Sequence, residues 1–280
     1  MKIGIGLPNQ VRDVRPAIIP GWAAEAERAG FSTVGTVGRV AYPGVMDTVA
    51  LAAAAGATSS IGLLSNVLLA PVWPAALLAK EAAGIDGISG GRLGLAVGAR
   101  PDDFVAAGHG IRGRGERFER DLRVYHDVWS GLPVGGNPAV PRGTREVPLL
   151  FGAGAPAAYE RMARWGHGYI APSVPPDRAA GAFDQAREAW RRAGRDGSPR
   201  LVAIAYFAFG DVEAGRGNVR DYYRNFGDET AGAIAAGVRG GAVAVKEAAA
   251  AFGDLGADEL IFNPGLDDLN EVRRLAETVL

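Results

Sequence analysis

The chain has 280 residues, of which 48% are hydrophobic and 22% charged, and its 30 Lys and Arg side chains nearly balance 31 Asp and Glu. This balance provides no broad positive field for phosphate backbones or anionic lipid, so we expect neither a nucleic-acid binder nor a membrane-associated protein. Cysteine is absent and the three histidines are scattered, which argues against thiol chemistry, disulfides and a Cys or His metal site.

Short aliphatic runs alternate with longer segments of helical periodicity, which is typical of βα units around a parallel sheet. We predict eight strands, in chain order at 2–7, 33–37, 61–69, 93–97, 148–151, 168–171, 201–209 and 259–262. Asp47 is expected to cap the helix after the second strand. Three connections are long, namely 100–115, 131–147 and 210–241, and we expect a pair of additional helices in the last.

Eight βα units without a linker predict an α/β fold, a single-domain (βα)8 TIM barrel over residues 1–280. The N-terminus shows no signal-peptide pattern, so a cytoplasmic protein is expected. The active site of such a barrel lies where the strands end. Those ends carry no lysine, and their carboxylates, Asp102 and Asp103, follow a single strand. We therefore expect a bound organic cofactor to supply the chemistry.

Two strand ends are candidate cofactor contacts. Gly152, Ala153, Gly154 and Ala155 lead directly into a helix, where small residues let backbone N–H groups approach a phosphate, although a tight βα turn needs glycine as well. Ser65 and Asn66 stand in an otherwise apolar strand, and their polar groups must find partners. A heteroaromatic ring, a neighbouring backbone group or ordered water would each satisfy them.

Short motifs along the whole chain resemble the luciferase-like family of flavin-dependent monooxygenases and oxidoreductases. In chain order they are Ile3-Gly-Ile-Gly-Leu-Pro8, Gly30-Phe31, Leu69-Ala-Pro71, Ser89-Gly-Gly-Arg92, Val97-Gly98, Gly115-Glu-Arg117-Phe118, Trp129-Ser-Gly131, Phe151-Gly-Ala-Gly154 and Gly166-His167-Gly168-Tyr169. Each motif is weak alone, and their shared order carries the resemblance.

The resemblance implies a (βα)8 barrel enzyme that oxidises a small organic substrate with reduced FMN and oxygen. Its alternatives are hydride transfer with the deazaflavin coenzyme F420, and a non-catalytic flavin-binding or partner subunit. A non-flavin sugar-phosphate barrel enzyme is disfavoured by the missing lysine and metal ligands. Members of the family include proteins served by a flavin reductase and proteins that form homodimers, so both partners are implied here.

By position, the resemblance assigns the back of the isoalloxazine pocket to Ser65, Asn66 and Val67, often with a non-proline cis peptide. It assigns further cofactor contacts to Gly98 and the phosphate to the loop of Gly152, Ala153, Gly154 and Ala155. We expect substrate contacts from Asn9, Arg100 and Tyr222.

The chain departs from the family at the end of the second strand, where many members carry an Asp-His pair and this chain has Gly38-Arg39. A mechanism that needs an imidazole there is therefore in doubt. Arg39 is our candidate catalytic residue, because a guanidinium can offset negative charge on a reduced flavin or an acidic substrate. The alternative is a salt-bridged residue of the barrel rim.

Overall fold

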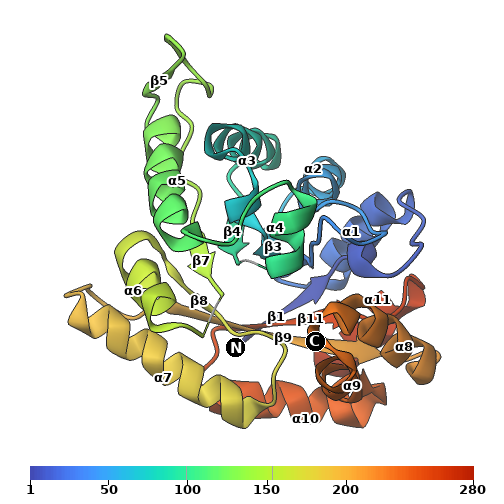
Figure 1. The fold of residues 1–280 in the computed structure, drawn as a ribbon. Coiled ribbons are helices and arrows are strands. Elements are labelled where there is room, and N and C mark those ends of the chain that lie inside the picture. The colour runs from blue at the N-terminus through green and yellow to red at the C-terminus, as the bar shows by residue number, and fades with distance from the viewer. Residues whose placement is uncertain (99, 153) are drawn as a thin grey trace.

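The computed structural model describes residues 1–98, 100–152 and 154–280. Within these ranges, eight parallel strands pair side by side into a closed barrel (Figure 1). In ring order they are β1 (Lys2–Gly6), β2 (Thr33–Thr36), β3 (Gly62–Leu68), β4 (Leu93–Val97), β7 (Leu149–Phe151), β8 (Gly168–Ile170), β9 (Arg200–Ala208) and β11 (Glu259–Pro264), which pairs again with β1. The predicted TIM barrel is confirmed, with strand ends that differ from the predicted ones by no more than about two residues.

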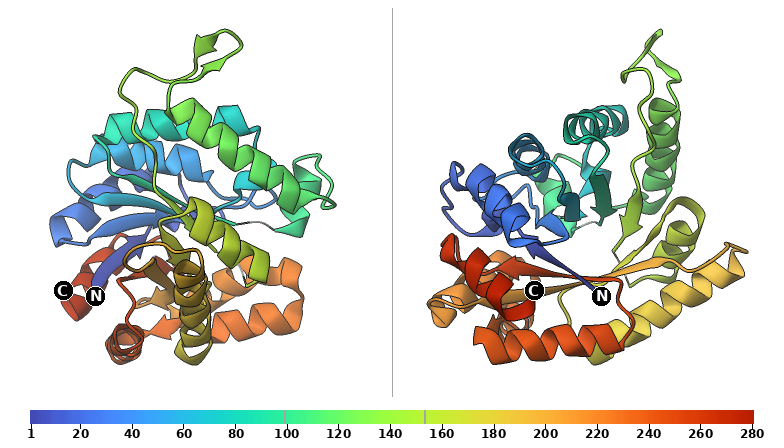
Figure 2. Two further views of the ribbon diagram at one scale, coloured as in Figure 1. Left: turned by 90° about the vertical axis from the view of Figure 1, so that its left-hand side faces the viewer. Right: turned by 180° about the vertical axis from the view of Figure 1, so that it is seen from behind.

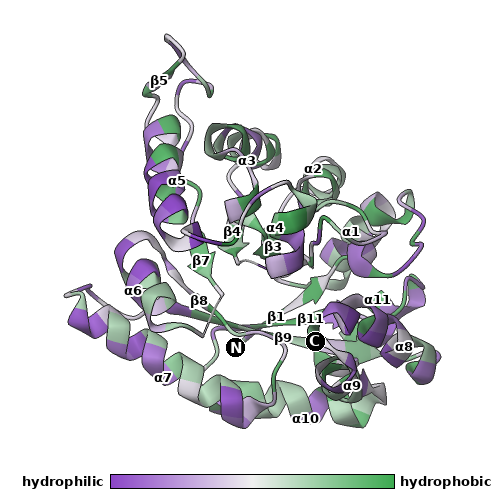
Figure 3. Ribbon diagram, viewed as in Figure 1, coloured by the Kyte–Doolittle hydropathy of each residue, from purple (hydrophilic) through white to green (hydrophobic). Residues whose placement is uncertain are grey.

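Helices surround the barrel because each connection between parallel strands has to cross back over the outside of the sheet. They are α1 (Ile18–Ala29), α2 (Asp47–Ala57), α3 (Ala75–Ser89), α4 (Pro101–Ala106), α5 (Arg114–Trp129), α6 (Pro156–Trp165), α7 (Pro176–Arg192), α8 (Val212–Tyr223), α9 (Asp228–Ala236), α10 (Gly241–Asp254) and α11 (Asn270–Val279). In Figure 3, hydrophobic and hydrophilic residues alternate along α5 and α7. The buried stripe of α5 includes Phe118, Leu122 and Trp129, as its helical spacing predicts.

The barrel interior is filled by aliphatic side chains that alternate with outward-facing residues along each strand. Leu64, Ala96, Leu150, Ile170, Val202, Ile204 and Ile261 form this inner cluster. A larger cluster lies between strands and helices and includes Trp22 and Phe183. The strands are therefore buried on both faces, which explains their nearly continuous hydrophobic sequence.

The three long connections carry additional structure. Residues 100–115 contain α4, and 131–147 contain a small hairpin of β5 (Pro133–Val134) and β6 (Asn137–Pro138) that protrudes from the barrel in Figure 2. Between β9 and α10 lie α8, a 3-10 turn η3 (Arg224–Phe226), α9 and the short strand β10 (Arg239–Gly240). The expected pair of additional helices is confirmed. No helix within the described ranges is long and apolar enough to cross a membrane.

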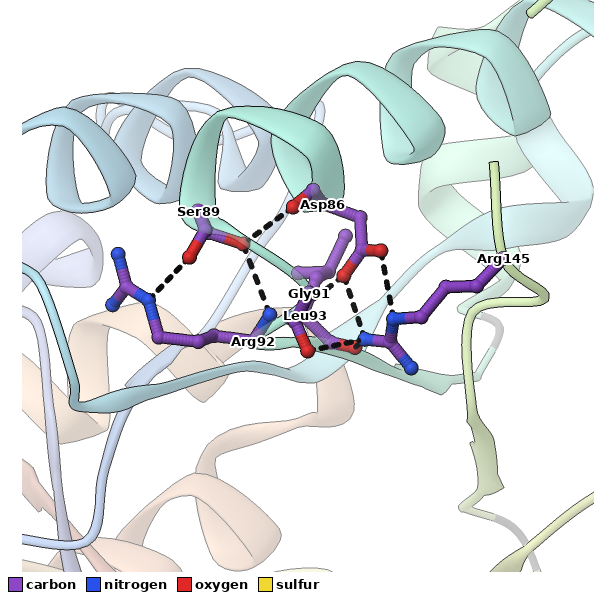
Figure 4. Close-up of polar contacts among 6 residues, drawn as sticks. All are labelled: Asp86, Ser89, Gly91, Arg92, Leu93 and Arg145. Atoms are coloured by element: carbon purple, nitrogen blue, oxygen red, sulfur yellow. Dashed lines mark hydrogen bonds and ion pairs between the residues drawn. The ribbon is translucent and has the colours of Figure 1, made fainter. Parts of the chain in front are cut away.

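The segment after the hairpin is held at the beginning of β4 by an ion pair (Figure 4). The Arg145 guanidinium donates to Asp86 Oδ2 at 2.8 Å and Oδ1 at 2.6 Å, and to the carbonyl oxygens of Gly91 and Leu93. Arg92 donates from Nε to the Ser89 carbonyl at 2.6 Å. This network stands at the N-terminal end of the strand, opposite the end where barrel sites form, so the Ser89–Arg92 motif has a structural role here.

Candidate active site

A cavity of about 620 Å³ lies at the C-terminal ends of the barrel strands. Its volume falls in the range typical of cofactor and small-molecule sites. The walls come from the ends of β2, β3, β4, β7, β8 and β9 and from α7, α8, η3 and α9. The residues that line it include Val37, Gly38, Asn66, Val67, Leu69, Gly98, Arg100, Gly152, Ile170, Ile204, Tyr222, Tyr223, Phe226, Thr230 and Ile234. The sequence prediction of a site at the strand ends agrees with this position.

One wall of the cavity is built around Val67. The peptide bond between Asn66 and Val67 is cis, as the family resemblance implies. A Cβ added at Gly98 would lie 2.7 Å from Val67 Cγ2, and one at Gly152 would lie 3.2 Å from Val67 Cγ1. The two glycines therefore let Val67 pack against the backbone at the ends of β4 and β7, and its side chain makes this part of the wall apolar.

The polar groups predicted in β3 have different surroundings. The Ser65 hydroxyl is fully buried and donates to the Ala96 carbonyl at 2.9 Å, so a backbone group satisfies it. Asn66 is 1% exposed, and its Nδ2 donates to Asn263 Oδ1 at 3.3 Å. Asn66 Oδ1 and Asn263 Nδ2 are buried without a hydrogen-bond partner in the described part of the chain. Because buried polar groups normally have partners, a ligand group with donors and acceptors fits at Asn66.

The predicted phosphate loop follows β7. Gly152 lines the cavity, whereas Gly154 and Ala155 are exposed just before α6. No heavy atom of the described chain lies within 4 Å of a Cβ added at Gly154, so its backbone is open to an approaching group. Ala155 precedes Pro156, the first residue of α6, where free N–H groups favour anions. Ala153, which we also predicted in this loop, lies outside the described residues.

Arg39 is placed beside the cavity and is committed to protein partners. Its side chain is 5% exposed and forms ion pairs with Asp102 and, at 3.8 Å, with Asp103 Oδ2. It also donates to the Tyr222 carbonyl at 2.8 Å and to Asn225 Oδ1 at 3.1 Å. It is not among the described residues that line the cavity. This geometry corresponds to the salt-bridged rim residue of our two alternatives, and the catalytic role of Arg39 stays a prediction.

The Asn9 side chain connects the segments that follow β1 and β2. Its Nδ2 donates to the carbonyl oxygens of Val37 and Val45 at 3.1 and 3.0 Å, and its Oδ1 accepts from the Val37 N–H. The amide is 1% exposed and does not line the cavity in the described structure. The bonds of Asn9 therefore hold the end of β2 in place, and the predicted substrate contact has no support from this geometry.

Tyr222 and Arg100, both predicted substrate contacts, do line the cavity. Tyr222 is 2% exposed and donates from its hydroxyl to the Gly38 carbonyl at 3.1 Å. Burial raises its pKa well above the ordinary value, so the phenol stays neutral. The Arg100 guanidinium carbon lies 4.6 Å from the ring centroid of Phe226 and 4.9 Å from those of Tyr222 and Tyr223.

Asp47 lies directly behind Gly38. A Cβ at Gly38 would be 1.6 Å from Asp47 Oδ2, so the carboxyl group occupies the space that a side chain at position 38 would take. Asp47 is 2% exposed. Burial, and to a smaller extent the charge of Asp103, raise its pKa to about 7. The expectation that Asp47 caps α2 is wrong, because Asp47 is the first residue of that helix and Met46 holds the cap position without a side-chain bond.

Several lining residues were missed at the sequence level. Ile170 and Ile204 belong to predicted strands, and their inward direction could have been found from the alternation along a barrel strand. Phe226, Thr230 and Ile234 lie in the excursion after β9. No local signal marks them, since their place over the barrel mouth depends on how α8 and α9 pack.

The chain is similar to known proteins in sequence over part of its length. An uncharacterised protein of Mycobacterium tuberculosis is 29% identical over 182 residues, a match that covers 52% of this chain and 63% of the relative. A homologue of the same description from Mycobacterium bovis matches equally. The chain thus spans less than two thirds of the length of these relatives.

Solved structures share the fold over nearly the whole chain. An F420-dependent secondary alcohol dehydrogenase in complex with an F420-acetone adduct superposes with a TM-score of 0.79 at 18% identity, covering 99% of this chain and 98% of that one. The monooxygenase RslO1 from Streptomyces bottropensis gives 0.77 at 22%, covering 100% and 98%. The oxygenating constituent of 3,6-diketocamphane monooxygenase from Pseudomonas putida, in complex with FMN, gives 0.74 at 16%, covering 99% and 95%.

A family model described as luciferase-like monooxygenase matches residues 1–265, which is most of the chain. The neighbours in structure are enzymes, with FMN or F420 named among their cofactors. Together with the barrel and its strand-end cavity, this match identifies the protein: the chain belongs to the luciferase-like monooxygenase family of oxidoreductases.

Proposed function

We propose that the protein is a monooxygenase that uses reduced FMN and oxygen on a small organic substrate. The observation that carries this proposal is the cavity wall of Asn66, Val67, Gly98 and Gly152, in which an apolar side chain packed between two glycines adjoins a buried carboxamide oxygen without a partner in the described chain. A tricyclic ring with polar edges fits such a surface, because it packs on Val67 and can bond to Asn66 Oδ1.

The residues of the chain bind, orient and exclude water. Gly154 and Ala155 would hold the cofactor phosphate through backbone N–H groups at the start of α6, whereas the Gly152 N–H already donates to the Val97 carbonyl at 3.0 Å. When bound, a reduced flavin supplies the electrons that activate oxygen or leave as hydride. The aromatic side chains of Tyr222, Tyr223 and Phe226 cover the cavity from the side of α8 and η3. Arg39 holds this cover against the β2 and β4 loops.

Hydride transfer with F420 is the second candidate. It is favoured by the likeness to the F420-dependent dehydrogenase at a TM-score of 0.79, slightly above the values for the two monooxygenases. Both cofactors carry a similar tricyclic ring and a phosphate, so the same wall and the same loop suit either. A reductase that delivers reduced FMN and a homodimer are further parts of the proposal.

The proposal is tested by titrating the protein with FMN, reduced FMN under anaerobic conditions, and F420, following cofactor fluorescence and absorbance. We expect tight binding of reduced FMN and a weaker complex with F420, whereas preference for F420 would establish the second candidate. Failure of all three to bind at high micromolar concentration would overturn both.

A matched pair of variants locates the phosphate. Gly154→Leu adds a side chain where the chain leaves open space, and Gly84→Leu does the same on α3, far from the cavity. We expect Gly154→Leu to weaken FMN at least ~10-fold (about 1.4 kcal/mol) and to affect riboflavin, which lacks the phosphate, much less. Gly84→Leu should leave both affinities unchanged.

A further inference from the structure

Arg100 is a cation without an ion-pair partner among the described residues of the cavity. Its guanidinium is enclosed by the rings of Tyr222, Tyr223 and Phe226 at 4.6 to 4.9 Å. Its Nη1 is buried and has no hydrogen-bond partner in the described part of the chain. Burial opposes the charged form of Arg100, but the pKa of a guanidinium is so high that the group stays charged.

Carboxylates are close in sequence, yet they are bound elsewhere. Asp102 and Asp103 lie two and three positions after Arg100, on α4, and both pair with Arg39. Asp103 Oδ1 also accepts the backbone N–H groups of Val40 and Ala41 at 2.7 and 3.0 Å. Both nearby carboxylates therefore pair with Arg39, and Arg100 Nη1 is left without an acceptor in the described chain. A buried donor of this kind is destabilising unless a ligand or water completes it.

The surroundings of Arg100 define the rest of the ligand. Aromatic faces attract a guanidinium, and they also pack well against a flat apolar body. Leu69 and Ile234 add aliphatic surface to the same cavity. The other charged residues that line it, Asp177 and Arg178, lie at the start of α7 after β8. An oxyanion that enters this cavity meets Arg100 beside an apolar wall.

We propose that Arg100 binds an anionic group of the substrate at the end of the cavity formed by Tyr222, Tyr223 and Phe226, and that the substrate is a planar, mainly apolar molecule carrying a carboxylate. A guanidinium presents two parallel N–H donors that match a carboxylate in geometry. This inference rests on the proposed function and extends it, because it names the class of substrate that the oxidoreductase site accepts.

The test compares benzoate with benzamide, which has nearly the same shape and no charge, as probes of the protein without cofactor. Binding is followed by calorimetry and by tyrosine and tryptophan fluorescence. We expect wild type to prefer benzoate by at least ~10-fold. Arg100→Met should bring the two affinities together, whereas Arg178→Met, which removes another arginine of the same cavity, should keep the preference. Equal binding of both probes by wild type overturns the inference, as does loss of the preference in Arg178→Met alone.

A second arm separates the substrate from the cofactor phosphate. Affinity for FMN in Arg100→Met should stay within about 2-fold of wild type. A fall of at least ~10-fold for FMN but not for riboflavin would instead place the cofactor phosphate on Arg100. Arg100→Lys keeps the positive charge and should keep part of the benzoate preference. This result would show that the loss of preference in Arg100→Met comes from the missing charge and not from a folding defect. Benzoate preference without binding of any flavin would remove the proposed function and leave the anion site, and the reverse result would remove only the anion site.

Discussion

Two arginines stand at neighbouring places on the barrel rim and have opposite surroundings. Arg39, after β2, is 5% exposed and bound to two carboxylates and a backbone carbonyl. Arg100, after β4, lies among three aromatic rings and has a buried nitrogen without an acceptor. Tyr222 lies between them, within 5.6 Å of one guanidinium and 4.9 Å of the other. The difference shows that the partners of an arginine, rather than its place at a strand end, decide whether it can serve a ligand.

The largest expected effect is the loss of the Arg39 ion pairs. Arg39→Met leaves Asp103, which is fully buried, with an uncompensated charge, and we expect a loss of about 3 kcal/mol in the free energy of unfolding. Arg100→Met removes ring contacts but also a buried donor without a partner, so it should cost less than half as much. Urea denaturation of both variants measures the difference.

Arg216 provides the control for this comparison, because its ion pair with Glu213 is on the surface of α8. Arg216→Met should change stability by less than about 1 kcal/mol. If Arg100→Met proved as destabilising as Arg39→Met, both arginines would be structural and the contrast between them would be lost.

The space behind Gly38 provides the next test, since it belongs to the Arg39 side of the rim. Gly38→Ala forces its Cβ into the Asp47 carboxyl and should destabilise the protein by about 2 kcal/mol. Asp47→Ala in the same chain opens that space, so the double variant should lose less than the sum of the two single changes. Purely additive losses in thermal or urea unfolding would show that Asp47 does not fill the place of the missing side chain.

The smallest effect is a pH dependence from Asp47. Its pKa is raised by burial to about 7 from an ordinary value of 3.8, so the folded state retains a proton that the unfolded state releases. The contribution to stability is therefore full below about pH 4 and is lost as the pH rises toward 7. Asp47→Asn cannot ionise, and its melting temperature relative to wild type should increase between pH 5 and pH 8 by at least about 2 °C. A constant difference across this range would contradict the raised pKa.

The barrel could be predicted from sequence because its signal is local and repeated. Each strand is a short apolar run between helical segments, and eight repeats leave few alternatives. The wall of Asn66, Val67, Gly98 and Gly152 could also be predicted, since these residues lie at strand ends and match segments of the family. These residues meet in the structure as the prediction requires.

The contacts at the barrel rim were harder to predict from the sequence, because they join residues that are far apart in the chain. The ion pairs of Arg39 depend on α4, and its backbone partner Tyr222 lies 183 positions away. The aromatic enclosure of Arg100 depends on how α8 and η3 fold over the barrel. Charge and residue type alone therefore made Arg39 and Arg100 similar candidates for a functional role, and only their packing in the structure distinguishes them.

The contrast between the two arginines is tested most directly by their own N–H groups. Side-chain ¹⁵N–¹H spectra of the protein without cofactor resolve arginine Nε–H signals, which Arg100→Lys and Arg39→Lys assign. On addition of benzoate, we expect the Arg100 signal to move with a saturating curve and the Arg39 signal to stay in place. A shift of Arg39 with Arg100 unchanged would contradict the account.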